Sequence, residues 1–261
     1  MSWDFVEVNV LSDSTGNAWD TILWIADVLE NNQLEPGLPS PQAFLDDAQH
    51  KREAEFFDLV MTEPPYYDAI PSSDTMAFFY VWLRLFLKDR YSFFASARTP
   101  KMAEIVKNAE AGKDEDFFLS SLTMVFEEAR RVLKDEGLMV FTFHHREHEA
   151  WSSVMGAVLD AGFYVSAIYP VQAEMSHSLH IRNQQAIEYD SIIVCRKRVG
   201  DGRISWEQLE DQVHFQAAEA LEQLQENAQG LSRADVSVIV LGKCLELYSK
   251  HYPNVMEEDQ S

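Results

Sequence analysis

The stretch Phe57-Asp58-Leu59-Val60-Met61-Thr62-Glu63-Pro64-Pro65-Tyr66-Tyr67 decides the fold of this chain. The apolar run from Phe56 to Met61 indicates a buried strand. Pro64 and Pro65 end it, because proline lacks the N–H that a sheet ladder needs. In α/β proteins, ligands bind at the carboxyl ends of such strands. We therefore expect a functional loop directly after this strand.

The loop residues Glu63, Pro64, Pro65 and Tyr66 are suited to hold an exocyclic amine. A conjugated amine is a poor nucleophile, and two acceptors around its hydrogens favour the geometry of the transition state. The Glu63 carboxylate and the Pro64 carbonyl supply such a pair, and the Tyr66 ring can stack on a flipped base. The alternative is a rigid Pro-Pro loop with a solvated Glu63. The position of the loop at a strand end favours the functional interpretation.

Helix and strand patterns lie on both sides of this loop. Residues 18–30 have apolar groups at helical spacing, and the aromatic-rich residues 74–88 predict a largely buried helix. The elements expected further on are a helix over 118–133 with Gly137 as its C-cap glycine, a strand over 138–143, a helix over about 147–161 with Gly162 as its capping glycine, a strand over 163–169 that Pro170 stops, and a strand over 191–195.

Strands that alternate with helices predict an α/β sandwich with a mostly parallel sheet. No helical pattern separates the last two strands, which favours an antiparallel edge strand. We expect a first domain over 1–199, with an insertion at about 89–115. An acidic helical appendage is expected over 200–261, with 12 acidic and four basic residues.

The expected location is the cytoplasm. No stretch approaches the roughly 20 apolar residues that cross a bilayer, and Met1–Val10 has no basic residue, unlike a signal peptide. The two cysteines, Cys195 and Cys244, lie far apart in the sequence. They form no metal-type pair, and so few, widely separated cysteines are typical of a protein in a reducing compartment.

The net charge is −22, from 43 acidic and 21 basic residues. Such a charge repels DNA at low salt, so composition alone does not suggest a nucleic-acid partner. A salt-rich cytoplasm would screen the repulsion, since the Debye length is about 3 Å at 1 M salt. Nine lysines beside 12 arginines also fit a halophilic surface. An ordinary acidic protein is the alternative.

The chain resembles the adenine-specific DNA methylases with an N-terminal domain of unknown function, most closely over residues 57–71 and 78–83. The likeness continues over residues 128–134, 137–145, 149–151, 161–163, 170–175 and 194–198, and takes in 4–9 and 248–253. It implies a Rossmann-like methyltransferase fold with S-adenosylmethionine as cofactor. It also implies methylation of the adenine amino group in DNA.

The chain departs from that family at two points. Glu63 stands where the family has aspartate, and a displacement of about 1 Å in such a site can cost on the order of 10²-fold in rate. The early glycines Gly16 and Gly37 do not form a glycine-rich loop after a strand, so the cofactor-binding residues are unknown.

These departures favour a chain that is the second half of a split or longer enzyme, whose cofactor half is an upstream-encoded partner. A non-catalytic, methyltransferase-like subunit is the second hypothesis. A third keeps the chemistry but changes the acceptor to an RNA base or a protein glutamine.

Other candidate residues lie close to the expected pocket. His144 and His145 follow a predicted strand end, where they can orient a phosphate or the base, or have a structural role. Neighbours in an extended segment point to opposite faces, which argues against joint metal binding, and we expect no metal site. Tyr67 is a weaker substrate-binding candidate. Asp68 can serve the amine or cap the turn.

The remaining polar and apolar candidates are weaker. Contacts to DNA are plausible in the polar loop that carries Glu174, His177, His180 and Arg182. The basic clusters at 130–131 and 196–198 are more typical of solvated element ends than of phosphate sites. Cys195 is expected to be buried and inert. Trp151 and the aromatic residues of 78–86 are expected in the core.

Overall fold

The structure of the chain is a computed structural model. It describes residues 17–33, 37, 41–42, 44–49, 54–68, 72–145, 147–172, 189–200, 202–227 and 233–256. The chain divides into two compact units, Met1–Leu45 and Asp46–Ser261. The first unit contains α1 (Ala18–Asn31), which matches the helix expected at 18–30. The Asn17 side chain caps this helix by accepting a hydrogen bond from the Asp20 N–H.

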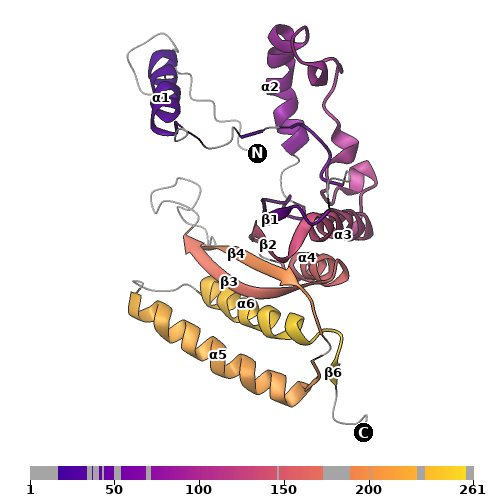
Figure 1. Cartoon of the computed structure of the whole chain (residues 1–261), viewed down its shortest axis with the longest axis vertical. Helices are drawn as coiled ribbons and strands as arrows, with labels where there is room; N and C mark the ends of the chain where they lie inside the picture. The colour runs from indigo at the N-terminus through magenta and orange to yellow at the C-terminus, as the bar shows by residue number, and fades with distance from the viewer. Residues whose placement is uncertain are drawn as a thin grey trace. The chain divides into compact units, whose positions relative to one another are not determined.

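The second unit is a mixed α/β structure around a four-stranded sheet (Figure 1). Its strands are β1 (Phe57–Thr62), β2 (Leu133–Phe143), β3 (Phe163–Gln172) and β4 (Tyr189–Lys197), in the order β1-β2-β4-β3. β1 and β2 pair in parallel, whereas β4 is antiparallel to both β2 and β3. Three strands therefore run one way and β4 runs the other.

The α/β architecture is thus confirmed, and so is the antiparallel pair formed by the last two strands. The strand that runs antiparallel to the others, β4, is not at the edge, however. β4 lies between β2 and β3, and β3 is the edge strand. The polar loop expected between the last two strands is compatible with either order, so only the pairing of β4 with β2 distinguishes the two orders.

The core lies between the sheet and two helices, α3 (Glu115–Val132) and α4 (His148–Asp160). α3 begins at Asp114, which accepts a hydrogen bond from the Phe117 N–H, and it has two acidic residues in its first turn. The apolar face expected on α3 is buried against the middle of β2. The core residues include Phe118, Leu122, Phe126, Met139, Phe141, Phe143, Trp151, Val154 and Val158.

Two expected element ends, a helix end at Gly137 and a strand end at Pro170, are not found in the structure. α3 ends at Val132 and continues directly into β2, so Gly137 is a strand residue and not a C-cap. A Cβ at Gly137 would lie 2.9 Å from Leu133 Cδ2, 3.0 Å from the Lys134 carbonyl oxygen and 3.3 Å from the Asp58 carbonyl oxygen, so crowding by the start of β2 and by β1 explains this glycine. β3 continues through Pro170, which pairs with Ser191. An edge strand tolerates proline because its outer N–H groups have no ladder partner. Gly162, at φ +81°, follows α4 as expected.

Helix α2 (Ser72–Leu87) corrects another expectation. It was predicted to be largely buried, yet none of its residues is buried. Trp82 is 56% exposed and Phe86 77%. α2 extends away from the sheet, and its described neighbours are the short 3-10 helices η1 (Ser92–Phe94) and η2 (Lys101–Ala103) (Figure 1). Local aromatic content therefore did not predict burial here.

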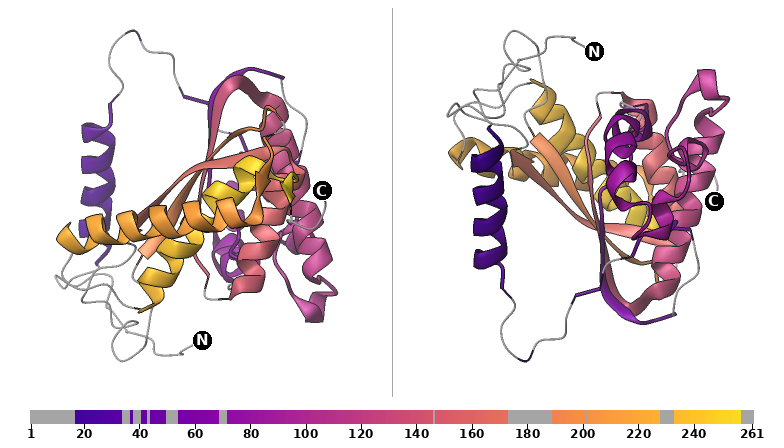
Figure 2. Two further views of the ribbon diagram at one scale, coloured as in Figure 1. Left: turned by 90° about the horizontal axis from the view of Figure 1, so that it is seen from below. Right: turned by 90° about the horizontal axis from the view of Figure 1, so that it is seen from above.

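The C-terminal residues form α5 (Trp206–Asn227), α6 (Arg233–His251) and the small parallel pair β5 (Ile204–Ser205) and β6 (Val255–Met256). These helices lie on the side of the sheet opposite α3 and α4 (Figure 2). α6 packs on β3, where the Val165 N–H donates to the Ser249 hydroxyl at 2.9 Å. The helices expected as an appendage thus lie in the same compact unit as the sheet.

No helix among the described residues is both long enough and apolar enough to span a bilayer.

Candidate functional site

The loop after β1 lies where several polar side chains converge. β1 and β2 are parallel, so their carboxyl ends meet at one edge, and the first residues of antiparallel β4 lie at that same edge. Glu63 is exposed there, whereas Pro64 is buried. The prolines thus fix the backbone while the carboxylate faces outward. This is the position at which open α/β sheets bind ligands.

Tyr66 connects the loop to the next strand. Its hydroxyl lies 3.1 Å from the Thr142 hydroxyl of β2 and 3.5 Å from Glu63 Oε1. Its ring packs edge-on against Phe143, with the ring centres 5.5 Å apart. Burial raises the pKa of Tyr66, the hydrogen bond to Thr142 lowers it, and the carboxylates of Asp190 and Glu63 raise it. The phenol is therefore neutral at physiological pH and is available as a donor.

Tyr67 holds the loop in place through its buried side chain and its backbone hydrogen bonds. Its side chain is fully buried against Phe118, and its φ of +53° lies in the left-handed region. Its backbone N–H donates to the Pro65 carbonyl, and its carbonyl accepts from the Lys107 N–H at 2.9 Å. Lys107 Nζ also donates to the Tyr67 hydroxyl at 2.9 Å. These contacts hold an unfavourable backbone conformation in place, so Tyr67 is a structural support for Tyr66 and Glu63.

His145 and Asp68 form the second connection between the two strand ends. His145 Nδ1 accepts a hydrogen bond from the Glu147 N–H, so the neutral ring has its proton on Nε2. That proton points to Asp68 Oδ1, at 2.9 Å. The Trp151 indole donates to the His145 carbonyl and fixes the backbone there. Asp68 therefore binds a histidine, which was not among the roles expected for it.

His144 approaches a different carboxylate. Its Nδ1 lies 2.9 Å from Asp190 Oδ1 of β4, although the approach is outside hydrogen-bond geometry. His144 and His145 thus contact separate partners, in keeping with the alternation of an extended segment. No group of three or more His, Cys, Asp or Glu side chains suited to a metal ion occurs in the part of the chain that the structure describes.

Three residues of this site were not singled out from the sequence. Thr142, Asp190 and Lys107 come from β2, β4 and the segment after α2, and long-range pairing brings them to the loop. Thr142 and Asp190 adjoin strand ends, which is the one signal that points to them. Lys107 gave no local signal.

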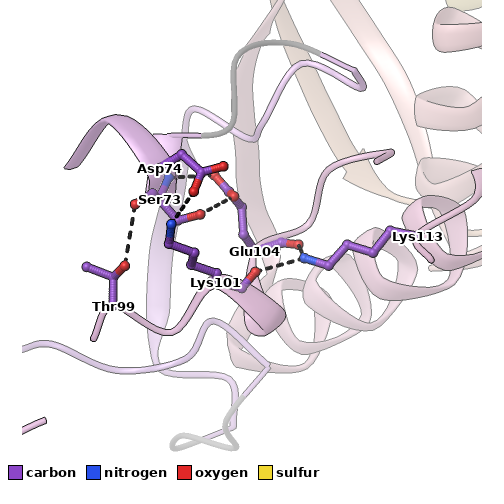
Figure 3. A network of polar contacts seen from close by, with 6 residues as sticks. All are labelled: Ser73, Asp74, Thr99, Lys101, Glu104 and Lys113. Atoms are coloured by element: carbon purple, nitrogen blue, oxygen red, sulfur yellow. Dashed lines mark hydrogen bonds and ion pairs between the residues drawn. The ribbon is translucent and has the colours of Figure 1, made fainter. Parts of the chain in front are cut away.

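A polar network joins α2 to the segment that supports Tyr67 (Figure 3). The Ser73 N–H and hydroxyl both donate to the Glu104 carboxylate, and the Thr99 hydroxyl donates to the Ser73 carbonyl. Lys101 pairs with Asp74. Buried Lys113 donates to the carbonyls of Lys101 and Glu104 at 2.9 and 2.6 Å. The start of α2 is therefore fixed to the same scaffold as the candidate site.

The other candidates have structural contacts or lie elsewhere. The basic clusters bind their own chain: Arg131 pairs with Glu128, Arg130 donates to the Gly162 carbonyl, and Arg198 donates to the Leu159 carbonyl. Cys195 and Trp151 are buried. The polar-loop candidates Glu174, His177, His180 and Arg182 lie outside the described residues.

No protein-family model matches the chain, and no curated protein sequence matches it.

Proposed function

We propose that this chain is the amine-binding half of a Rossmann-like, S-adenosylmethionine-dependent DNA adenine methyltransferase. The observation that carries the proposal is the convergence of Glu63, Tyr66 and Thr142 at the carboxyl ends of two parallel strands. The mixed sheet is compatible with the Rossmann-like α/β fold that the family resemblance implies.

The residues of the loop have distinct roles in this proposal. The Glu63 carboxylate and the Pro64 carbonyl accept the two hydrogens of the adenine amine, so the nitrogen lone pair is directed at the incoming methyl group. Tyr66 stacks on the base, and its neutral hydroxyl keeps Glu63 oriented from 3.5 Å. His145 and Asp68 brace the loop against β2. The methyl–sulfur bond of the sulfonium would break as the nitrogen–methyl bond forms, the cofactor would leave as the neutral thioether S-adenosylhomocysteine, and the methylated amine would lose one proton to solvent.

The cofactor belongs to a partner chain in this proposal. S-adenosylmethionine supplies the methyl group, but the loop after β1 consists of Glu63 and two prolines and offers no glycine-rich cradle. β1 is an edge strand of the described sheet. Val60 packs on the core, whereas Leu59 and Met61 on the opposite face are 50% and 73% exposed. A strand added by the partner would pair with the open backbone edge of β1 and place a second loop beside Glu63, and apolar groups that accompany it would cover Leu59 and Met61.

Methyl transfer is the direct test. The chain should be incubated with methyl-labelled S-adenosylmethionine and DNA, alone and with the product of the upstream gene, at low and high salt. We expect label in adenine N6 when both chains are present. Glu63→Gln should lower the rate by on the order of 10²-fold or more, since a donor then replaces an acceptor. Competition with RNA and with glutamine-containing protein tests the third hypothesis, in which the acceptor is an RNA base or a protein glutamine. No transfer to any acceptor would overturn the proposal.

The second candidate function is a non-catalytic subunit with the same fold. It is favoured by Glu63 in place of the family's aspartate and by the missing cofactor loop. Glu63→Asp separates the two functions. The shortened side chain should retain or raise transfer in an enzyme, whereas a non-catalytic subunit shows no transfer with either residue. Its role would then be seen as a change in the partner's activity that is insensitive to Glu63.

A further inference from the structure

The segment from Ser72 to Lys101 has a charge opposite to that of the whole chain. It contains five basic residues and two acidic ones, a net charge of +3 in a chain of −22. Lys88, Arg90 and Arg98 are exposed. At about 0.1 M salt the Debye length is about 10 Å, so a charged ligand at this segment responds mainly to these nearby groups.

Contacts between α2 and residues 88–101 determine where the basic residues of this segment lie. The Tyr80 ring stacks on Phe94, and the Arg84 guanidinium donates to the Ser96 carbonyl at 2.7 Å. Further back, Thr99 contacts Ser73. Residues 88–101 therefore return along α2 toward its first turn, as Figure 1 shows. Lys88 and Arg90 lie at the far end and Arg98 lies between them and the start of the helix.

This row of basic residues leads to the candidate site. Thr99 and Lys101 contact the first turn of α2, and from Lys101 the chain continues to Lys107, which bonds both the backbone and the hydroxyl of Tyr67. α2 has 16 residues, which corresponds to roughly 24 Å of helix at 1.5 Å per residue. The basic residues thus extend over several phosphate spacings of a nucleic-acid strand.

Exposed aromatic rings accompany the basic residues. Tyr91 and Phe93 are 50% and 48% exposed, and their rings stack with centres 5.4 Å apart. A hollow of about 640 Å³ lies between α2 and residues 97–103, and Tyr80, Arg98 and Lys101 are among its lining residues. Its size is within the range of small-molecule sites and admits a nucleotide. Basic residues interleaved with stacking platforms are typical of nucleic-acid surfaces.

We propose that α2 and residues 88–101 form the DNA-binding surface of this protein, with Lys88, Arg90 and Arg98 contacting phosphates that flank the target adenine. This inference rests on the proposed function, because it locates the substrate of that reaction. It also accounts for DNA binding by a chain of net negative charge, since 41 of the 43 acidic residues lie outside this segment.

The test is DNA binding by the full chain without cofactor, measured by fluorescence anisotropy on a labelled duplex and on its single strands over a salt series. Arg90→Glu/Arg98→Glu should weaken binding at least about tenfold at low salt. The slope of log K against log salt should fall by about 2 for the duplex, since each phosphate contact contributes about 0.9. Tyr91→Ala/Phe93→Ala should weaken single-strand binding about fivefold or more and leave the slope unchanged.

The matched control is Arg203→Glu/Lys250→Glu, which makes the same charge change beside the C-terminal helices. It should retain wild-type affinity and slope, and circular dichroism should show that all variants fold. Equal weakening by both charge reversals, or no DNA binding by the wild-type chain, overturns the inference. The inference is also overturned if the Arg90→Glu/Arg98→Glu variant keeps its DNA affinity but no longer binds the upstream gene product. The surface would then be a protein interface. Specific DNA binding without methyl transfer would overturn the proposed function alone.

Discussion

At the residue scale, the candidate site depends on a few side chains whose environment sets their chemistry. Tyr66 is half-buried between Phe143 and Thr142, and Tyr67 is fully buried beneath it. Two adjacent tyrosines therefore have different tasks. The hydroxyl of the first contacts Glu63 and Thr142 at the strand ends, and the second holds the loop.

Tyr66→Phe tests the hydroxyl contact. Loss of the bond to Thr142 should lower the free energy of unfolding by about 0.5–1.5 kcal/mol. Because burial raises the pKa of Tyr66 above the ordinary 10.0, the stability from its neutral hydroxyl is full below pH 10 and is lost as the pH rises further. In denaturant titrations the advantage of the wild type over the variant should shrink as the pH rises above 10, because burial and the carboxylates of Asp190 and Glu63 disfavour the phenolate. A difference that does not change with pH would contradict this assignment.

The two cysteines should differ in reactivity. Burial raises the pKa of both thiols, and Cys195 is almost entirely enclosed in β4 whereas Cys244 is partly exposed on α6. Since the thiolate is the nucleophile, alkylation at neutral pH should be slow at Cys244 and absent at Cys195 until the protein unfolds. Peptide mass mapping after timed alkylation distinguishes the two. Equal labelling in the native state would be incompatible with this burial.

At the element scale, β2 determines where the site forms. It runs directly out of α3, pairs in parallel with β1 and in antiparallel with β4, and ends at the two histidines. Its close approach to β1 at Gly137 sets the register that brings Thr142 opposite the loop.

Gly137→Ala tests this approach. The added Cβ would meet Leu133 and two backbone oxygens, so we expect a loss of about 1–3 kcal/mol in the free energy of unfolding. Gly156→Ala is the comparison, since its Cβ would meet only the end of the Leu119 side chain at 3.2 Å. Alanine is favoured over glycine in a helix by up to about 1 kcal/mol, so that variant should be neutral or more stable. The reverse ranking in chemical denaturation would contradict this crowding around Gly137.

Lys113→Met tests the scaffold behind Tyr67. The change keeps an aliphatic stem but leaves the carbonyls of Lys101 and Glu104 without their donor, at a cost of about 1–3 kcal/mol. Hydrogen exchange should accelerate at residues 101–107 while the amides of α4 stay protected. Lys113→Arg retains a donor and should show a smaller effect. Uniform acceleration throughout the chain would indicate global destabilisation instead.

At the scale of the whole molecule, charge is the dominant feature. A net charge of −22 on 261 residues stores self-repulsion in the compact state, and salt screens it. Raising sodium chloride from about 0.1 to 1 M, where the Debye length falls from about 10 to about 3 Å, should therefore raise the melting temperature. Sucrose at matched osmolality serves as the uncharged comparison. An unchanged or lower melting temperature in salt would argue against a halophilic surface.

Local patterns predicted the elements better than their arrangement. The apolar face of residues 118–133 and the glycine at 162 are local signals, and both α3 and the end of α4 follow them. The placement of β4 inside the sheet depends on pairing with β2 across a distant part of the chain. The burial of α2 was wrongly predicted because aromatic content does not reveal what covers a helix. Thr142 and Asp190 were missed for the same reason, since only the folded sheet brings them to the loop.

The edge position of β1 has a consequence for the life of the chain in the cell. Among the described residues one edge of β1 has no ladder partner, and such an open edge with exposed leucine and methionine is a template for self-association that natural proteins usually cover. If the proposed partner chain pairs with this edge, we expect this chain to depend on it for solubility during synthesis. Its abundance should then follow the stoichiometry of co-expression, with excess copies removed by quality-control proteases.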